Sequence, residues 1–184
     1  MGEKYTAIND RHSTFIAKQQ MFFVATATAD SRINLSPKGL KNSLRILGPN
    51  RVIWLNLTGS GNETAAHLPQ DKRMTVMFCA FEGPPLILRL YGHSRMVLTS
   101  DDEWDSLYAH FEPLPGARQI FDMTVDLVHT SCGFGVPLYD FSGECPLLNR
   151  WAEKKGEEGI RNYWREKNAI SLDGEAIPIA DTDD

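Results

Sequence analysis

Residues 57–64 carry the strongest chemical signal in this sequence. An apolar run ends there, two glycines follow, and a polar triplet opens a short predicted helix, so that the candidate residues are Leu57, Thr58, Gly61, Asn62, Glu63 and Thr64. The first N–H groups of a helix have no partner within the helix and can receive an anion such as a phosphate. The glycines would allow close approach of a ligand or a positive φ, and the hydroxyls would add donors. In the plainer alternative, Asn62 only caps the helix and the glycines only shape a turn.

A second polar group lies at the end of a predicted strand, with Asn34, Ser36, Pro37 and Lys38 as candidates. We expect Pro37 to stop strand pairing, because proline has no N–H to donate, and to leave the Ser36 hydroxyl and the Lys38 ammonium free. Lys38 could then neutralise a phosphate or lie beside an electron-poor ring. The alternative is a solvated lysine in a turn.

The third candidate is the loop at 131–137, where two glycines flank an aromatic ring just after a strand. Such a loop allows tight approach to a planar ligand or to a partner subunit. Cys132 could be a reactive thiol, but it has no evident Cys–His pairing and no basic neighbour, so packing is the favoured role. The histidines show no metal-ligand spacing, so no metal site is predicted. No residue stands out as an obligatory general base.

These segments need a framework of strands with a few helices around it. Runs rich in β-branched and aromatic residues predict strands at 21–28, 33–36, 51–57, 73–81, 86–98 and 119–130. The strand at 51–57 is so densely apolar that we expect both of its faces to be buried. Helices are predicted at 10–20, 65–70 and 101–110, with a C-terminal helical segment at about 144–168 that is interrupted near Gly156 and Gly159. This order of elements predicts a mainly β (α+β) barrel with peripheral helices rather than a doubly wound sheet.

Length and composition are those of an ordinary globular protein. The chain has 184 residues, 42% hydrophobic and 23% charged, so we expect one domain over 1–184 with a disordered acidic tail at 181–184. The formal net charge of −5 argues against non-specific nucleic-acid binding, which needs a basic surface. No apolar run approaches the roughly 18 residues of a membrane span, and the N-terminus lacks the apolar stretch of a secretory signal. Three cysteines without a CxxC spacing fit free thiols, so the expected location is the cytoplasm.

Taken in order, several segments of this chain resemble the pyridoxamine 5′-phosphate oxidase-like flavoproteins. No single segment decides the resemblance, but the ordered set is specific and spans about residues 10–170. The segments are 22–27, 34–39, 57–68, 77–85, 90–92 and 130–139.

The resemblance implies a six-stranded antiparallel split β-barrel that forms a homodimer, with two FMN molecules at the subunit interface. It also implies that the strand at 34–38 contacts the flavin ring and phosphate, and that the loop and helix start at 58–64 hold the phosphate. Arg89 would add charge, and the loop at 131–137 would reach toward the flavin of the other subunit. The expected cofactor-binding residues are Asn34, Ser36, Pro37, Lys38, Leu57, Thr58, Gly61, Asn62, Glu63, Thr64, Arg89, Ser131, Cys132 and Gly133.

The chain departs from the family pattern at two places. Oxidases that act on the phosphorylated vitamin use an Arg/Lys pair at the helix start, where this chain has Asn62, Glu63 and Thr64. A carboxylate beside a phosphate dianion is repulsive, so Glu63 must point away, pair with a base such as Lys38, or signal a different ligand. The family's C-terminal arginine–histidine substrate signature is also missing, and residues 135–140 stand in its place. Both departures argue against pyridoxamine 5′-phosphate as the substrate.

The leading hypothesis from the sequence is an FMN-dependent oxidoreductase that acts on an unknown small molecule. A flavin carries the hydride chemistry, so the protein has to supply orientation and electrostatics. The alternatives are a non-catalytic flavin- or haem-binding sensor or carrier, and a deazaflavin-dependent reductase on the same barrel.

Overall fold

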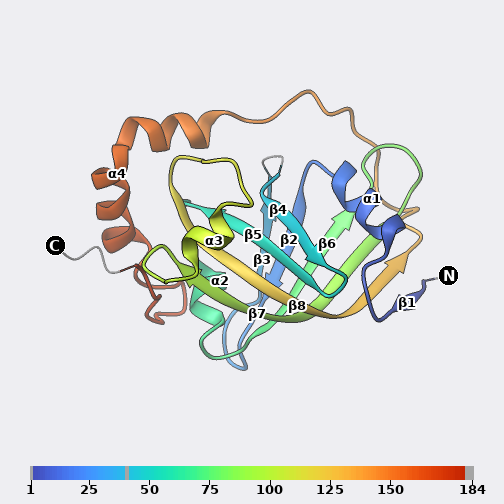
Figure 1. The fold of residues 1–184 in the computed structure, drawn as a ribbon, viewed down its shortest axis with the longest axis horizontal. Helices are drawn as coiled ribbons and strands as arrows, with labels where there is room; N and C mark the ends of the chain where they lie inside the picture. Colours follow the sequence, from blue (N-terminus) through green and yellow to red (C-terminus); the bar gives the residue numbers. More distant parts are fainter. Residues whose placement is uncertain (1, 40–41, 181–184) are drawn as a thin grey trace.

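A computed structural model describes residues 2–39 and 42–180, which form a curved sheet with helices around it (Figure 1). The tail at 181–184, for which the sequence predicts disorder, lies outside the described residues. The strands are β1 (Lys4–Tyr5), β2 (Phe22–Thr26), β3 (Asn34–Lys38), β4 (Leu44–Gly48), β5 (Arg51–Leu57), β6 (Arg73–Cys79), β7 (Ile87–Leu98) and β8 (Ala117–Ser131). The helices are α1 (Asp10–Lys18), α2 (Glu63–His67), α3 (Trp104–Tyr108) and α4 (Leu147–Lys167).

All described strands belong to one antiparallel sheet in the order β3-β2-β6-β7-β8-β5-β4, with β1 paired to β8. The longest strand is β8, which has 15 residues and pairs with β1, β5 and β7. Among the described residues no ladder joins the edge strands β3 and β4, so the sheet forms a split barrel. After β8 the chain crosses back over the barrel as an extended segment before α4 begins (Figure 1).

Aromatic side chains fill the barrel interior. The Trp54 ring stacks on Phe121 with ring centroids 4.4 Å apart, and Phe22 packs against Trp54 and Phe78. A second apolar cluster on the other face of β5 packs under α3. The prediction that β5 is buried on both faces is therefore confirmed, since every residue from 52 to 56 is buried.

One carboxylate is buried in the sheet and is held by two arginines. Asp122 accepts hydrogen bonds from Arg51 at 2.9 Å and from Arg95 at 2.9 Å. Burial raises the pKa of Asp122, but the hydrogen bonds from the two guanidinium groups outweigh burial and hold the pKa below its usual value. Arg95 also pairs with Glu103 just before α3, so the network ties β5, β7 and β8 to this helix.

The sheet has more strands than the six that the sequence predicts, because β1 and β4 are additional. β1 has only two residues, too few to show a pattern, and β4 is separated from β5 by only two residues. The expectation that Pro37 ends strand pairing is wrong, because Pro37 lies inside β3 opposite Phe23. An edge strand tolerates proline, since one of its sides has no neighbouring strand to receive a hydrogen bond.

The helices follow the predictions with shifted ends. α2 begins at Glu63, before the predicted start at 65, and α3 is confined to Trp104–Tyr108. α4 is interrupted at Gly156, whose φ of 68° is left-handed, as the sequence predicts for this region. Within the described residues, no helix combines the length and apolarity that crossing a membrane requires.

Candidate functional site

Strand β3 presents three polar side chains on one face, because alternate residues of a strand point to the same side. These are Asn34, Ser36 and Lys38, all partly buried, whereas the residues between them are exposed. The Ser36 hydroxyl donates to Asn34 Oδ1 at 2.9 Å, and Asn34 Nδ2 donates to the Thr64 hydroxyl at 3.1 Å. The fold thus brings together the two segments that the sequence singles out, β3 and the start of α2.

Lys38 lies against an aromatic ring and near a second cation. Its Nζ is 5.2 Å from the centroid of the Trp54 ring. Burial, followed by the charge of Arg118, lowers the pKa of Lys38 to about 8. No carboxylate forms an ion pair with Lys38 within residues 2–39 and 42–180. This environment differs from that of a solvated lysine in a turn.

The second cation, Arg118, is almost completely buried at 2% exposure. Its Nη1 donates to Asn168 Oδ1 at 2.6 Å and its Nη2 donates to the Gly61 carbonyl at 3.2 Å, while its Nε has no partner. Burial lowers the pKa of the guanidinium to about 10, which leaves it charged at neutral pH. In the described part of the chain no carboxylate neutralises it either, so two positive charges share one region.

Buried amide donors without acceptors lie near the two cations. Asn56 Nδ2 donates to Gln119 Oε1 at 2.9 Å and to Asn62 Oδ1 at 3.5 Å. These bonds use the amide oxygens and leave Gln119 Nε2 and Asn62 Nδ2 buried with no partner among the described residues. Trp54 Nε1 is also buried and has no acceptor among the described residues. A buried donor without an acceptor costs about 1–3 kcal/mol. Gln119 and Trp54 are 0% exposed and Asn62 is 5% exposed, so of the three side chains Asn62 is the one placed nearest to a ligand from outside.

The loop before α2 bends without special backbone angles. Neither Gly59 nor Gly61 has a positive φ, and a Cβ at either position would meet no atom within 4 Å. Packing within the chain therefore does not require glycine at these positions. The Thr58 hydroxyl already donates to the Gly116 carbonyl at 2.8 Å, so its hydrogen is not available to a ligand.

The start of α2 differs from a simple capped helix. Asn62 occupies the N-cap position, but its side chain makes no capping hydrogen bond. The Glu63 carboxylate accepts from the Leu172 amide, with both oxygens at 3.3 Å. The Glu63 carboxylate is therefore bound by the C-terminal segment. It does not pair with Lys38, which was one of the roles considered for it.

The remaining predicted residues form a separate group at the far end of β8. Arg89 Nη1 donates to the Ser131 hydroxyl at 3.1 Å, and Cys132 is exposed beside it in the chain. Gly133 has a φ of 67°, and a Cβ there would lie 2.9 Å from the Leu86 nitrogen, so glycine is needed for packing against this turn. Within the described residues no hydrogen bond, ion pair or ring contact joins this group to Lys38 or to α2.

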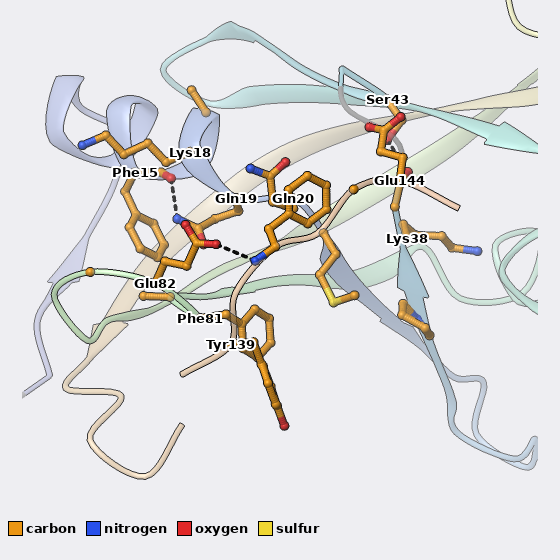
Figure 2. Close-up of a pocket in the computed structure, with 18 of the residues that line it drawn as sticks. Phe15, Lys18, Gln19, Gln20, Lys38, Ser43, Phe81, Glu82, Tyr139 and Glu144 are labelled. Carbon is orange, nitrogen blue, oxygen red and sulfur yellow. Dashed lines mark hydrogen bonds between the residues drawn. The ribbon is translucent and has the colours of Figure 1, made fainter. Parts of the chain in front are cut away.

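A large open pocket of about 1750 Å³ lies beside Lys38 (Figure 2). Its walls are α1, residues 37–39, the turn at 80–86 and the segment 139–148. Figure 2 shows Lys38 on the side of the pocket away from Phe15 and Lys18 of α1, and Tyr139 against Phe81, their ring centroids 5.6 Å apart. Small-molecule pockets usually measure about 300–1000 Å³, so this space exceeds the needs of one small ligand.

Sequence reasoning missed four polar residues of this region: Asn56, Arg118, Gln119 and Asn168. Asn56 had a usable signal, because it is a polar residue inside an otherwise apolar strand. The other three belong to no local motif, and only the fold reveals that they are buried together.

The chain is similar in sequence to known proteins. The profile of the family described as pyridoxamine 5′-phosphate oxidase matches residues 8–132. The chain is 36% identical over 192 residues to the pyridoxamine 5′-phosphate oxidase family protein ustO of Aspergillus flavus, in an alignment that covers 92% of this chain and 75% of that protein.

The fold is similar to solved structures of HupZ from Group A Streptococcus. A HupZ variant superposes with a TM-score of 0.54 at 17% identity, covering 67% of this chain and 99% of that chain. A second HupZ structure gives a TM-score of 0.52 at 18% identity, covering 65% and 91%. At such identities the similarity concerns the fold alone.

Proposed function

Because the chain belongs to the pyridoxamine 5′-phosphate oxidase family, we propose that it binds FMN through its phosphate and acts as an FMN-dependent oxidoreductase on a small substrate. The proposal is carried by the buried donor cluster around Lys38 and Arg118, which has two cations and, within the described residues, no neutralising carboxylate. A phosphate dianion has the complementary properties, since it brings negative charge and several strong acceptors.

Four groups of this chain fit the phosphate. We assign to it the Lys38 ammonium, the unpartnered Asn62 Nδ2 and the backbone amides at 62–64, with the Thr64 hydroxyl beside them. Arg118 would act from behind the loop, because its Nη2 already holds the Gly61 carbonyl. Asn34 and Ser36 continue the same face of β3, and we assign them to the region between phosphate and ring.

FMN, when bound, supplies hydride transfer, which none of the amino-acid side chains can perform. The chain supplies binding, orientation and charge. In the ligand-free protein Lys38 can hold or release a proton at Nζ near neutral pH, because its pKa is about 8, and a bound phosphate would favour the charged form. The substrate class stays open beyond a small molecule that reaches the pocket beside Lys38.

We further propose that the chain forms a homodimer with the flavin between subunits. In support, the segment after β8 exposes large apolar side chains, among them Phe134 at 81% and Leu138 at 67%. Exposed apolar surface of this kind marks an interaction surface. Light scattering should give about twice the 20.7 kDa of one chain, and a monomer at micromolar concentration would contradict the dimer.

The test of the cofactor is a paired titration of the purified, ligand-free protein with FMN and with riboflavin, which lacks the phosphate. We expect FMN to bind more tightly, and Lys38→Met to weaken FMN by about 10- to 100-fold, the value of a charged hydrogen bond, without changing riboflavin affinity. Lys18→Met is the matched control, because Lys18 is an exposed lysine lining the same pocket. Equal affinities for the two flavins in the wild type would contradict phosphate binding.

The visible spectrum of the protein as purified separates the alternatives. The two visible bands of an oxidised flavin support FMN, a sharp Soret band supports a haem-binding module, and a colourless protein favours a deazaflavin or no resident cofactor. Oxygen consumption with added pyridoxamine 5′-phosphate would show that the two departures in the sequence do not prevent that reaction.

A further inference from the structure

The C-terminal segment that follows the residues matched by the family profile makes polar contacts with the loop at 58–61. The profile ends at 132, whereas these contacts come from the end of α4 and the residues just after it. Each residue of the loop is held by at least one hydrogen bond to another part of the chain. The loop itself contains two glycines and no regular structure, so these contacts are what restrict its backbone.

Asn168 is the central contact. It lies immediately after α4 and is 1% exposed. Its Nδ2 donates to the Gly59 carbonyl at 3.1 Å and to the Ser60 carbonyl at 3.4 Å, and its Oδ1 accepts from Arg118 at 2.6 Å. Because Arg118 in turn donates to the Gly61 carbonyl, one asparagine and one arginine fix three consecutive carbonyls of the loop. With these carbonyls held on one side, the loop amides are left to face the other.

Trp164 holds the beginning of the same loop. Its Nε1 donates to the Thr58 hydroxyl at 2.7 Å, and this hydroxyl donates to the Gly116 carbonyl at 2.8 Å. Trp164 itself is anchored in an apolar cluster with Ala152 and Ile160 of α4. The loop start is therefore fixed to the helix through a buried side-chain bond.

We propose that Asn168 and Trp164 are positioning residues that hold the loop at 58–61, and through it the amides at 62–64, in the conformation that receives a phosphate. The inference rests on the proposed function for the ligand, but the ordering of the loop is a property of the chain alone. It predicts that the C-terminal segment sets the preference of the protein for a phosphorylated flavin, although it contributes no atom to the phosphate itself.

The test compares Asn168→Ala with Asn162→Ala in the full chain. Asn162 is an exposed residue of α4 whose side-chain oxygen accepts from Arg165 at 3.1 Å, so it controls for the loss of an asparagine near the end of this helix that makes no hydrogen bond to the loop among the described residues. Removing Asn168 leaves two carbonyls and one guanidinium N–H without their partner, so we expect FMN affinity to fall about tenfold or more. Riboflavin affinity should stay unchanged, because riboflavin has no phosphate for the loop to hold.

Hydrogen–deuterium exchange of the ligand-free protein gives a readout that does not depend on any cofactor. The amides that flank the loop are hydrogen-bonded, since Thr58 N donates to the Gly116 carbonyl at 2.8 Å and Ala65 N donates to the Asn62 carbonyl at 3.0 Å. We expect these two amides to exchange faster in Asn168→Ala than in the wild type, with unchanged exchange in β8. If FMN binds to no form of the protein, the proposed function fails, while the exchange result still decides whether Asn168 orders the loop.

Three results would overturn the inference: unchanged exchange at the amides of Thr58 and Ala65 in the variant, unchanged FMN affinity, or a parallel loss of FMN and riboflavin binding, which would mean a general structural role. If Asn168→Ala does not fold, Trp164→Phe replaces it, because phenylalanine keeps the apolar packing and removes only the donor to Thr58. The same three comparisons then apply to Trp164→Phe, with a smaller expected loss of about threefold to tenfold in FMN affinity.

Discussion

Raising the pH should weaken FMN binding through a single group, Lys38. Its pKa of about 8 in the ligand-free protein means that about nine tenths of the molecules carry the charge at pH 7 and about one tenth at pH 9. A bound phosphate favours the charged form and raises this pKa, so binding at high pH requires uptake of a proton. FMN affinity should therefore fall as the pH rises above the pKa that Lys38 has in the ligand-free protein. The expected loss is about tenfold between pH 7 and pH 9.

At lower pH a different group takes over. The phosphate loses its second charge near its second pKa of about 6, so affinity should also fall below that value. Binding should accordingly be tightest between about pH 6 and pH 8. Equilibrium fluorescence titrations at constant ionic strength measure the curve, because salt would otherwise screen the same charges. Riboflavin, titrated in parallel, reports any change that does not involve the phosphate.

Lys38→Arg is the decisive control. A guanidinium stays charged throughout this range, so the variant should keep its affinity at pH 9 and lose the slope above pH 8. Lys38→Met should bind FMN more weakly at pH 7, and its affinity should likewise not fall further above pH 8. A slope that persists in Lys38→Arg, or a flat curve in the wild type, would refute the argument that the Lys38 charge is what the ligand senses.

Two further predictions concern the barrel that carries the site. Asp122→Asn should lower the free energy of unfolding by about 2–3 kcal/mol, measured by urea denaturation, because it leaves two arginines facing a neutral amide in the sheet. This loss is smaller than that for a fully buried ion pair, since both arginines are partly exposed. Asp126→Asn, an exposed carboxylate on the same strand, should change it by less than about 1 kcal/mol, and equal losses in the two variants would contradict the assigned role. Gly92→Ala should destabilise the protein by several kcal/mol or prevent folding, since a Cβ there would lie 1.9 Å from the Thr124 carbonyl oxygen. Gly135→Ala meets no atom within 4 Å and should leave the melting temperature unchanged. The β7–β8 ladder shifts register between Tyr91 and Gly92, and a stable Gly92→Ala protein would show that this irregularity adapts to a side chain.

The local sequence pattern predicts most of the strands, because a long run of strand-forming residues between turn residues is recognisable in the sequence. β7 and β8 fall close to their predicted ranges, and the break in α4 at Gly156 follows from a residue that tolerates left-handed angles. The errors have physical causes. The sequence predicts that Pro37 ends its strand, whereas Pro37 lies inside β3. Proline interrupts a central strand but is tolerated in an edge strand, and a single sequence does not show which of the two a strand is.

The candidate site was predictable only in part, for a related reason. Lys38 and Asn62 stand in segments with recognisable residue types, so the sequence could propose them. Arg118 and Asn168 could not be proposed, because 50 residues separate them and each is ordinary in its own segment. Burial and shared partners make them notable, and those appear only when β8 and the end of α4 are placed side by side.

The proline in β3 has an effect on how this molecule meets other copies of itself. β3 is an edge strand, and its free side would be open to pairing with a strand from another chain. Pro37 interrupts the row of amide hydrogens that such an intruder would need, and the strand is only five residues long. Pro37 therefore prevents a strand of another chain from pairing continuously with this edge, while β3 remains paired with β2 along its whole length.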